Sequence, residues 1–426
     1  MALRFTGTVD NPKLLDLPWS TPLEEWPPES LVALPRGISR HVVRFVRVDH
    51  VVYALKEVIA DLAIGEYRLL RTLERMEIPS VHGVGVALGR VDENGEELDA
   101  ILATHHLQFS LPYRALFSHT LRPDTADRLL DALVVLLAQL HLAGFYWGDC
   151  SLSNTLFRRD AGAFAAYLVD AETGEMHPEL SNGQRNLDLE IARVNIIGEL
   201  MDLAGGGLLH ESIDPITTGD DVVRRYEGLW RELTDTNVLD IDQRHEIEAR
   251  IRRLNDLGFD VAELDITTDW HGRQVRLQPK VVDAGHHSRR LLRLTGLDVE
   301  ENQARRLLND LDAYAAATDQ QGEDEEIVAH EWVTKCFEAV VRMVPARLRG
   351  KLEPAEIYHE VLEHRWFMAE ALGREVSLNE AARDYIDSVL AHKPDERAVL
   401  GARPTYDRVA DVETTAEIRI VFPEEV

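Results

Sequence analysis

The chain has 426 residues, 45% of them hydrophobic, and a formal net charge of −29. This length suits two or three domains, and the apolar fraction is ordinary for a globular protein. So acidic a chain repels phosphate backbones, which argues against nucleic acid as a partner. Two cysteines, no basic-then-apolar leader and no long uncharged apolar stretch predict a soluble, cytoplasmic protein without disulfides, secretory signal or transmembrane segment.

The N-terminal third predicts a small antiparallel lobe preceded by an arm. Residues 1–33 are rich in proline and tryptophan and predict an irregular arm, which Trp19 and Trp26 would pack onto the body. Residues 34–108 show strand, strand, helix, strand and strand in order, from their β-branched runs, helical spacing and turn residues. We therefore expect one helix to lie on a small sheet.

The rest of the chain predicts a larger lobe and a mainly helical domain. Residues 109–206 contain two long apolar helical patterns, at 125–142 and 187–203, and end in a run of glycines that marks a boundary. Residues 207–426 predict amphipathic helices with one short β-hairpin, and we expect Trp366 and Phe367 in the helical core. The predicted fold class is α+β, with a two-lobed domain followed by a mostly α-helical C-terminal domain.

Candidate chemistry gathers between residues 144 and 175. Asp149 and Asn154 flank a short polar turn, and an apolar strand pattern ends at Asp170. Two acids and an amide in this order can hold a divalent cation, a triphosphate and an acceptor hydroxyl. The alternative is that the first two are turn-formers and the third a helix N-cap.

A second pair lies upstream. Lys56 ends a predicted strand and Glu66 lies early in the helix that follows. An ammonium steadied by a helix carboxylate is a usual phosphate clamp. The alternative is that the two residues form an exposed pair without contact. The order along the chain of a lysine, a glutamate, the Asp–Asn pair and a final aspartate favours the clamp.

These motifs resemble those of the protein-kinase-like superfamily, closest to its aminoglycoside phosphotransferase and lipopolysaccharide kinase branch. EYRLLRTLERMEIPSVHGVGVAL (66–88) resembles the helix that carries the glutamate, WGDCSLSN (147–154) the catalytic loop, and LVDAE (168–172) the metal-binding strand end. The whole chain is also similar to uncharacterised bacterial proteins that carry a C-terminal domain of unknown function.

The resemblance implies an ATP- and Mg²⁺-dependent phosphotransferase that acts on an unidentified hydroxyl acceptor. A small molecule or sugar is expected as the acceptor in preference to a protein. Asp149 would be the base, Lys56 the clamp and Glu66 its partner, with Asn154 and Asp170 as metal ligands. The residues expected to contact the nucleotide are Gly37, Ser39, Lys56, Thr104, His106 and Gln108. The C-terminal half is a candidate surface for a protein partner.

Some residues depart from the family pattern or leave roles open. Trp147 replaces a histidine that braces the loop, and the glycine-rich loop has one glycine. These departures favour the alternative, a non-catalytic nucleotide-binding scaffold whose acidic helical half binds a partner protein. Asp188 either anchors the catalytic loop or is a first-turn dipole acid. Cys150 is expected to be a buried filler rather than a reactive thiol.

Overall fold

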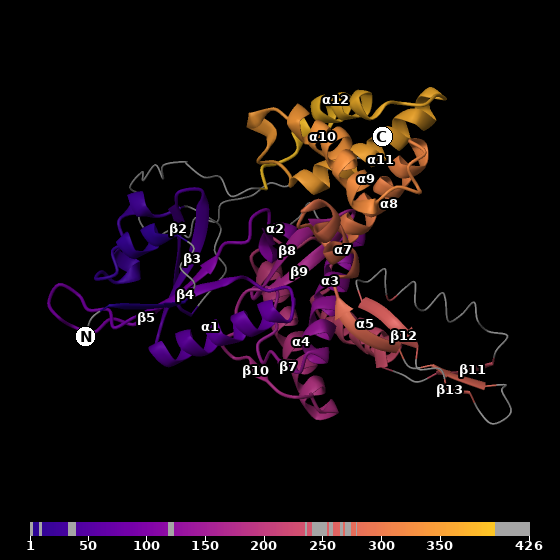
Figure 1. Cartoon of the computed structure of the whole chain (residues 1–426). Helices are drawn as coiled ribbons and strands as arrows, with labels where there is room; N and C mark the ends of the chain where they lie inside the picture. The colour runs from indigo at the N-terminus through magenta and orange to yellow at the C-terminus, as the bar shows by residue number, and fades with distance from the viewer. Residues whose placement is uncertain are drawn as a thin grey trace.

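The computed structural model describes residues 3–7, 11–32, 40–117, 123–234, 237–240, 254, 259–264, 267–268, 274–277 and 279–396. Figure 1 shows a small lobe at the N-terminal end, a large lobe beside it, and a helical C-terminal body against the large lobe. The predicted hairpin turn at 269–272 lies outside the described residues.

The small lobe is a five-stranded sheet in the order β1-β4-β5-β3-β2. Its neighbouring strands pair antiparallel, and α1 packs on β4 and β5. The predicted sequence of strand, strand, helix, strand and strand is confirmed. The elements are β1 (Arg4–Gly7), β2 (Val42–Val48), β3 (Val51–Val58), α1 (Ala60–Arg75), β4 (Gly83–Leu88) and β5 (Ala100–His105).

The N-terminal arm belongs to this lobe and is less irregular than predicted. Its first described residues form β1, which covers the open edge of β4 and so protects that edge from other chains. Short 3-10 helices follow, and Trp19 and Trp26 are each 3% exposed in a cluster with the outer face of the sheet. The predicted packing of these tryptophans is confirmed. The short helices are η1 (Pro12–Asp16), η2 (Leu23–Glu25) and η3 (Pro28–Ser30).

The large lobe is built on two long helices and a β-hairpin. The predicted helix at 125–142 is α3, and the one at 187–203 is α4, which begins earlier because Ser181 and Gln184 form a capping box. A further helix, α5, packs against both. The elements are β6 (Leu111–Pro112), α2 (Tyr113–Leu116), α3 (Pro123–Leu142), β7 (Phe145–Tyr146), β8 (Thr155–Asp160), β9 (Ala163–Leu168), β10 (Glu175–Met176), α4 (Asn182–Gly205) and α5 (Pro215–Thr234).

The C-terminal body packs its helices around Trp332 and Tyr358, both fully buried and in edge-to-face contact at 5.7 Å. Short strands precede it: β11 (Asn237–Asp240), β12 (Phe259–Leu264), β13 (Thr267–Thr268), β14 (Gln274–Leu277) and β15 (Pro279–Ala284). Its helices are α7 (His286–Thr295), α8 (Glu301–Ala317), α9 (Glu325–Trp332), the π-helical turn η5 (Val333–Phe337), α10 (Glu338–Met343), η6 (Ala346–Leu348), α11 (Pro354–Leu372), α12 (Leu378–Ser388) and η7 (Leu390–His392). The described helices include none long and apolar enough to cross a membrane.

The prediction that Trp366 and Phe367 lie in the core is wrong. They are 60% and 59% exposed, respectively, and contact each other edge to face. Nearly every residue of α11 after Val361 is exposed or half-buried. Leu362, Met368 and Ala369 of these last turns still pack against the core. Trp366 and Phe367 therefore lie on the outer side of the helix, and helical spacing alone does not reveal which side is covered.

Charged residues at the end of β8 join the large lobe to the C-terminal body. Arg158 pairs with Glu300 at 2.8 Å and Glu353 at 2.6 Å. Asp160, 3% exposed, accepts hydrogen bonds from the backbone N–H groups of Gln303 at 2.7 Å and Asn302 at 3.2 Å. The carboxylate thereby caps the start of α8, so the hairpin and the helical body share one buried polar interface.

We predict that Asp160→Ala lowers stability by about 1–3 kcal/mol, because it leaves buried backbone donors without an acceptor. Burial and the nearby Glu300 charge raise the pKa of Asp160 to about 7. A raised carboxyl pKa contributes stability that is complete below about pH 4 and lost as pH rises through about 7. The melting temperatures of the wild type and of Asp160→Ala should therefore differ more near pH 5 than near pH 8.

Asp312→Ala is the matched control, since Asp312 is exposed on α8, the helix that Asp160 caps. Its melting temperature should stay close to that of the wild type at every pH. An Asp160→Ala protein as stable as this control would contradict the interface described above.

Candidate active site

The predicted catalytic loop (147–154) connects β7 to β8 and is anchored by Asp188 of α4. The Asp188 carboxylate is fully buried and accepts the backbone N–H groups of Trp147 and Gly148, both at 2.8 Å. The ring of His141 lies 3.1 Å from the same carboxylate. Because α4 begins at Asn182, Asp188 lies beyond the first turn. Of its two proposed roles, the loop anchor is confirmed.

Trp147 performs the bracing that was expected to be lost with the histidine. Its side chain is fully buried, and its indole N–H donates to the backbone carbonyl of Asp170 at 2.9 Å. Its own carbonyl accepts the Thr173 hydroxyl at 2.8 Å. The indole thus ties the catalytic loop directly to Asp170, two residues after the end of β9, and the substitution does not weaken the site in the predicted way.

Asp149 and Asn154 lie in direct contact across the loop. The Asn154 amide donates to the Asp149 carbonyl at 3.0 Å and to its carboxylate at 3.1 Å. The other carboxylate oxygen accepts the Asn195 amide of α4 at 3.0 Å. Sequence reasoning missed Asn195, although its position seven residues after Asp188 places both on one face of a helix.

Lys56 lies at the centre of three carboxylates. Its ammonium is 3.0 Å from Glu66, 2.9 Å from Asp170 and 2.7 Å from Glu172. The predicted pairing of Lys56 with Glu66 is therefore present, and Glu172, which the sequence analysis did not assign, joins it. Glu172 also contacts His41, just before β2, at 2.9 Å. Glu172, from the large lobe, thus contacts two residues of the small lobe, Lys56 and His41.

The charges of this cluster shift one another's pKa values. Burial alone would lower the pKa of Lys56, but the Glu66 and Asp170 carboxylates outweigh it and raise that pKa. Burial and the Asp170 charge raise the pKa of Glu66 to about 7. Burial opposes ionisation of Glu172 as well, yet Lys56 and His41 lower its pKa. The cluster therefore keeps the ammonium charged.

The residues that could hold a divalent cation overlap with this cluster at Asp170. Ligand atoms of Glu66, Asp170 and Glu172 lie within 4.8 Å of one another, but the cation that they share is the Lys56 ammonium. Asn154 and Asp170 lie on adjacent strand ends, where the Val169 N–H donates to the Asn154 carbonyl at 3.0 Å. Since the Asn154 amide nitrogen faces Asp149, its Oδ1 points elsewhere. An amide oxygen beside a carboxylate fits Mg²⁺.

The predicted nucleotide contacts are only partly described. Gly37 and Ser39 lie outside the described residues. Thr104 is paired within β5, and the His106 N–H donates to the Val52 carbonyl at 2.9 Å. That donor is therefore already used, so an adenine contact between Thr104 and Gln108 would need other backbone groups. Burial also lowers the pKa of the His106 ring to about 4, which keeps the ring neutral.

Two further features are not part of this constellation. Cys150 is fully buried, and burial raises its thiol pKa well above the ordinary value, as expected for a filler.

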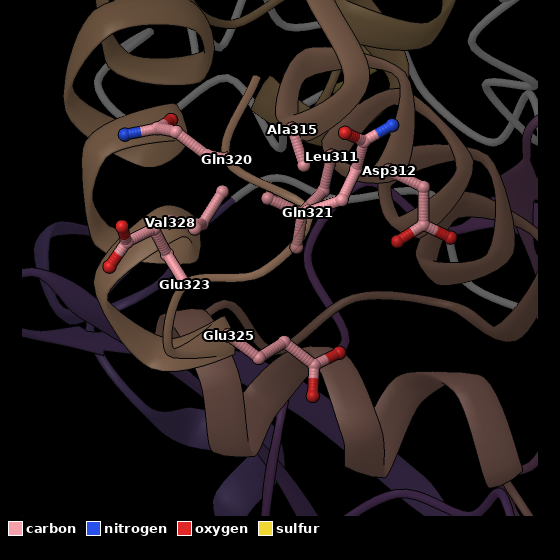
Figure 2. Close-up of a pocket in the computed structure, with 8 residues that line it drawn as sticks. All are labelled: Leu311, Asp312, Ala315, Gln320, Gln321, Glu323, Glu325 and Val328. Carbon is pink, nitrogen blue, oxygen red and sulfur yellow. The ribbon is translucent and has the colours of Figure 1, made fainter. Parts of the chain in front are cut away.

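A cavity of about 400 Å³ lies in the C-terminal body, between α8, α9 and their connection. Figure 2 shows its lining, which contains none of the predicted site residues: Leu311, Asp312, Ala315, Gln320, Gln321, Glu323, Glu325 and Val328.

A small lobe with a lysine–glutamate clamp, joined to a large lobe with an Asp–Asn loop and an acid after the next strand, defines a protein-kinase-like fold. Comparison with known families agrees: residues 45–193 match the Lipopolysaccharide kinase (Kdo/WaaP) family. Residues 228–390 match a Domain of unknown function (DUF4032). The chain therefore contains a segment similar to the kinase-like lipopolysaccharide kinase family, followed by a segment that matches this second domain.

Among solved structures, the chain is similar to one titled "WaaP in complex with acyl carrier protein". The match has 17% sequence identity and a TM-score of 0.36, and covers 60% of this chain and 99% of that chain. No curated protein matches the chain.

We predict that Trp147→Phe loosens the catalytic loop. The substitution leaves the Asp170 carbonyl without its donor and opens a cavity, which together cost about 2–4 kcal/mol. Hydrogen exchange should rise in the backbone amides of the loop (147–154) and of residues 169–172.

Trp332→Phe is the matched control, because that buried indole donates to Asp310 at 2.8 Å in the C-terminal body. It should destabilise the protein without raising exchange in the catalytic loop. Equal exchange in both variants would show that Trp147 does not brace the loop.

Proposed function

We propose that this protein is an ATP- and Mg²⁺-dependent phosphotransferase with a hydroxyl acceptor. The observation that carries the proposal is the convergence of Asp149, Asn154, Asp170 and the Lys56–Glu66 clamp between the two lobes. A family match over residues 45–193 supports the same class. Such chemistry depends mainly on positioning and on neutralising charge, which these residues are suited to do.

In the proposed reaction the acceptor oxygen attacks the γ-phosphorus of ATP. The bond from that phosphorus to the β–γ bridging oxygen breaks, and ADP leaves with the bonding electron pair. The hydroxyl proton passes to the Asp149 carboxylate. Lys56 would hold the α- and β-phosphates, and Glu66 would hold Lys56 in place.

Asn154 and Asp170 would hold the metal, which when bound neutralises the negative charge of the transferring phosphoryl group. The Asp170 side chain is 30% exposed while the clamp residue Glu66 is 2% exposed. The carboxylate proposed as a ligand is therefore the one open to an entering cation, and the one proposed as a support is enclosed.

We propose a small molecule or sugar as the acceptor. The chain passes from Asp170 through one short strand, β10, to the capped start of α4 at Asn182. A protein substrate is usually held by a longer segment at this place, so the short connection favours a smaller acceptor. The name of the matching family, lipopolysaccharide kinase, points to a sugar hydroxyl.

One observation favours a second candidate, a nucleotide-binding scaffold without catalysis. An ammonium has three N–H groups, and Lys56 has three carboxylate partners here. Phosphate can reach Lys56 only by displacing one of them. A scaffold would bind nucleotide while keeping these three contacts, whereas an enzyme would replace one of them by a contact between Lys56 and an ATP phosphate.

The proposal is tested by ATP binding and turnover in purified protein. We expect ATP with Mg²⁺ to raise the melting temperature, and ADP to appear over time. Asp170→Ala should abolish the Mg²⁺-dependent part of binding. Asp149→Asn should keep binding but lower turnover by roughly 10²-fold or more, because the proton acceptor is lost.

Glu190→Gln serves as the control for a lost surface charge, since Glu190 is 59% exposed on α4. It should leave binding and turnover unchanged. Binding without turnover in the wild type would favour the scaffold, and no binding would exclude both candidates.

We also predict that Glu172→Gln strengthens nucleotide binding. The substitution removes a charged competitor for Lys56, and hydrogen bonds to charged groups are worth about 1.5–3 kcal/mol, so ADP affinity without Mg²⁺ should rise roughly tenfold or more. Isothermal titration calorimetry measures the change directly.

Glu74→Gln is the matched control for charge, since Glu74 lies on α1 and pairs with Arg71 and His82. It should leave ADP affinity unchanged. If Glu172→Gln instead weakens only Mg²⁺-dependent binding, Glu172 supports the metal rather than competing with phosphate.

A further inference from the structure

One face of α4 bonds the catalytic loop at three successive places. Asp188, Asn195 and Glu199 are spaced by seven and four residues, so they share a face of the helix. Asp188 binds the backbone at the start of the loop. Glu199 accepts the N–H groups of Leu152 and Ser153 at 2.8 Å and 3.0 Å near its end. Asn195 lies between them and contacts Asp149.

We propose that Asn195 is a positioning residue that sets the orientation of the Asp149 carboxylate. This inference rests on the proposed function, in which Asp149 accepts the proton. Asp188 and Glu199 contact the backbone and hold the loop as a whole. Asn195 instead reaches the side chain that would react.

The contacts of Asn195 fix its own orientation. Its amide nitrogen lies 3.0 Å from Asp149 Oδ1 and 3.2 Å from the Cys150 carbonyl. Both neighbours are acceptors, so the NH₂ group must face them, and each of its two N–H bonds has one partner. The amide cannot flip without placing its oxygen against two other oxygens.

Together, two amides hold both oxygens of the carboxylate. Asn154 donates to Asp149 Oδ2 at 3.1 Å, and Asn195 donates to Oδ1. The terminal torsion of an aspartate is otherwise broad, so these two bonds fix the carboxylate plane. Each carboxylate oxygen can still accept another hydrogen bond. The lone pair that would receive the acceptor proton is therefore held in a set direction.

Asn195 is independent of the nucleotide clamp. Its described contacts go to the loop and not to Lys56, Glu66 or Asp170. Loss of Asn195 should therefore impair the chemical step while leaving nucleotide binding intact. A residue with only a structural role would not separate the two.

The test uses Asn195→Leu in the full chain, with ATP and Mg²⁺ and with water as the acceptor. Leucine has a similar branched shape and no donor. We expect kcat for ADP formation to fall about 10- to 100-fold, since a small misplacement of a reacting group can cost that much. The dissociation constant for ATP with Mg²⁺ should change by less than about twofold.

Two further variants sharpen the result. Ile196→Val trims the next side chain, which is fully buried and faces the core, and it should leave kcat unchanged. Asn195→Leu in an Asp149→Asn background should cause little additional loss, because residues that act through each other are not additive. If Asn195→Leu does not fold, Asn195→Ala removes the same donors without added bulk.

The outcomes separate this inference from the proposed function. Wild-type turnover with an unchanged Asn195→Leu kcat, or with equal losses in kcat and ATP affinity, overturns the role of Asn195 alone. A full additional loss in the Asp149→Asn background overturns it too. Absence of ADP formation by the wild type overturns the proposed function, and the role of Asn195 falls with it.

Discussion

The buried carboxylate of Asp188 is the constraint on which the candidate site depends. It accepts two consecutive backbone N–H groups at 2.8 Å and has no exposure to water. An unpaired carboxylate there would be costly, so loop and helix must form together. Gly148, with a φ of 74°, allows the backbone to present both donors. This contact fixes the start of the loop, and Glu199 of the same helix holds its end.

The charge balance around Lys56 determines which ligands the proposed site would accept. Three carboxylates around one ammonium leave an excess of negative charge where a triphosphate would bind. A site with this charge balance resists anions until a cation enters with them. In the proposed function this arrangement would favour nucleotide together with its metal over nucleotide alone, and Glu172 would make that preference stronger than the lysine–glutamate pair by itself.

Much of the fold could be predicted from the sequence, because strand and helix periodicities are local. The small-lobe order, the helices around the catalytic loop and the Lys56–Glu66 pair were all accessible in this way. Trp147 was misjudged because the sequence does not reveal that an indole N–H can reach the Asp170 carbonyl. Asn195 and Glu172 were missed because each acts through a contact between distant segments. Trp366 was misplaced because periodicity identifies an apolar face and not what covers it.

The polar interface at the end of β8 has a consequence for how the two domains can be separated. The single strand β8 runs from Thr155, directly after the catalytic loop, to Asp160, which caps α8. A chain cut after the large lobe would expose Arg158, Arg159 and Asp160 without their partners. The kinase-like part therefore shares a buried charged interface with the C-terminal body, and separating the two would leave these side chains exposed to water.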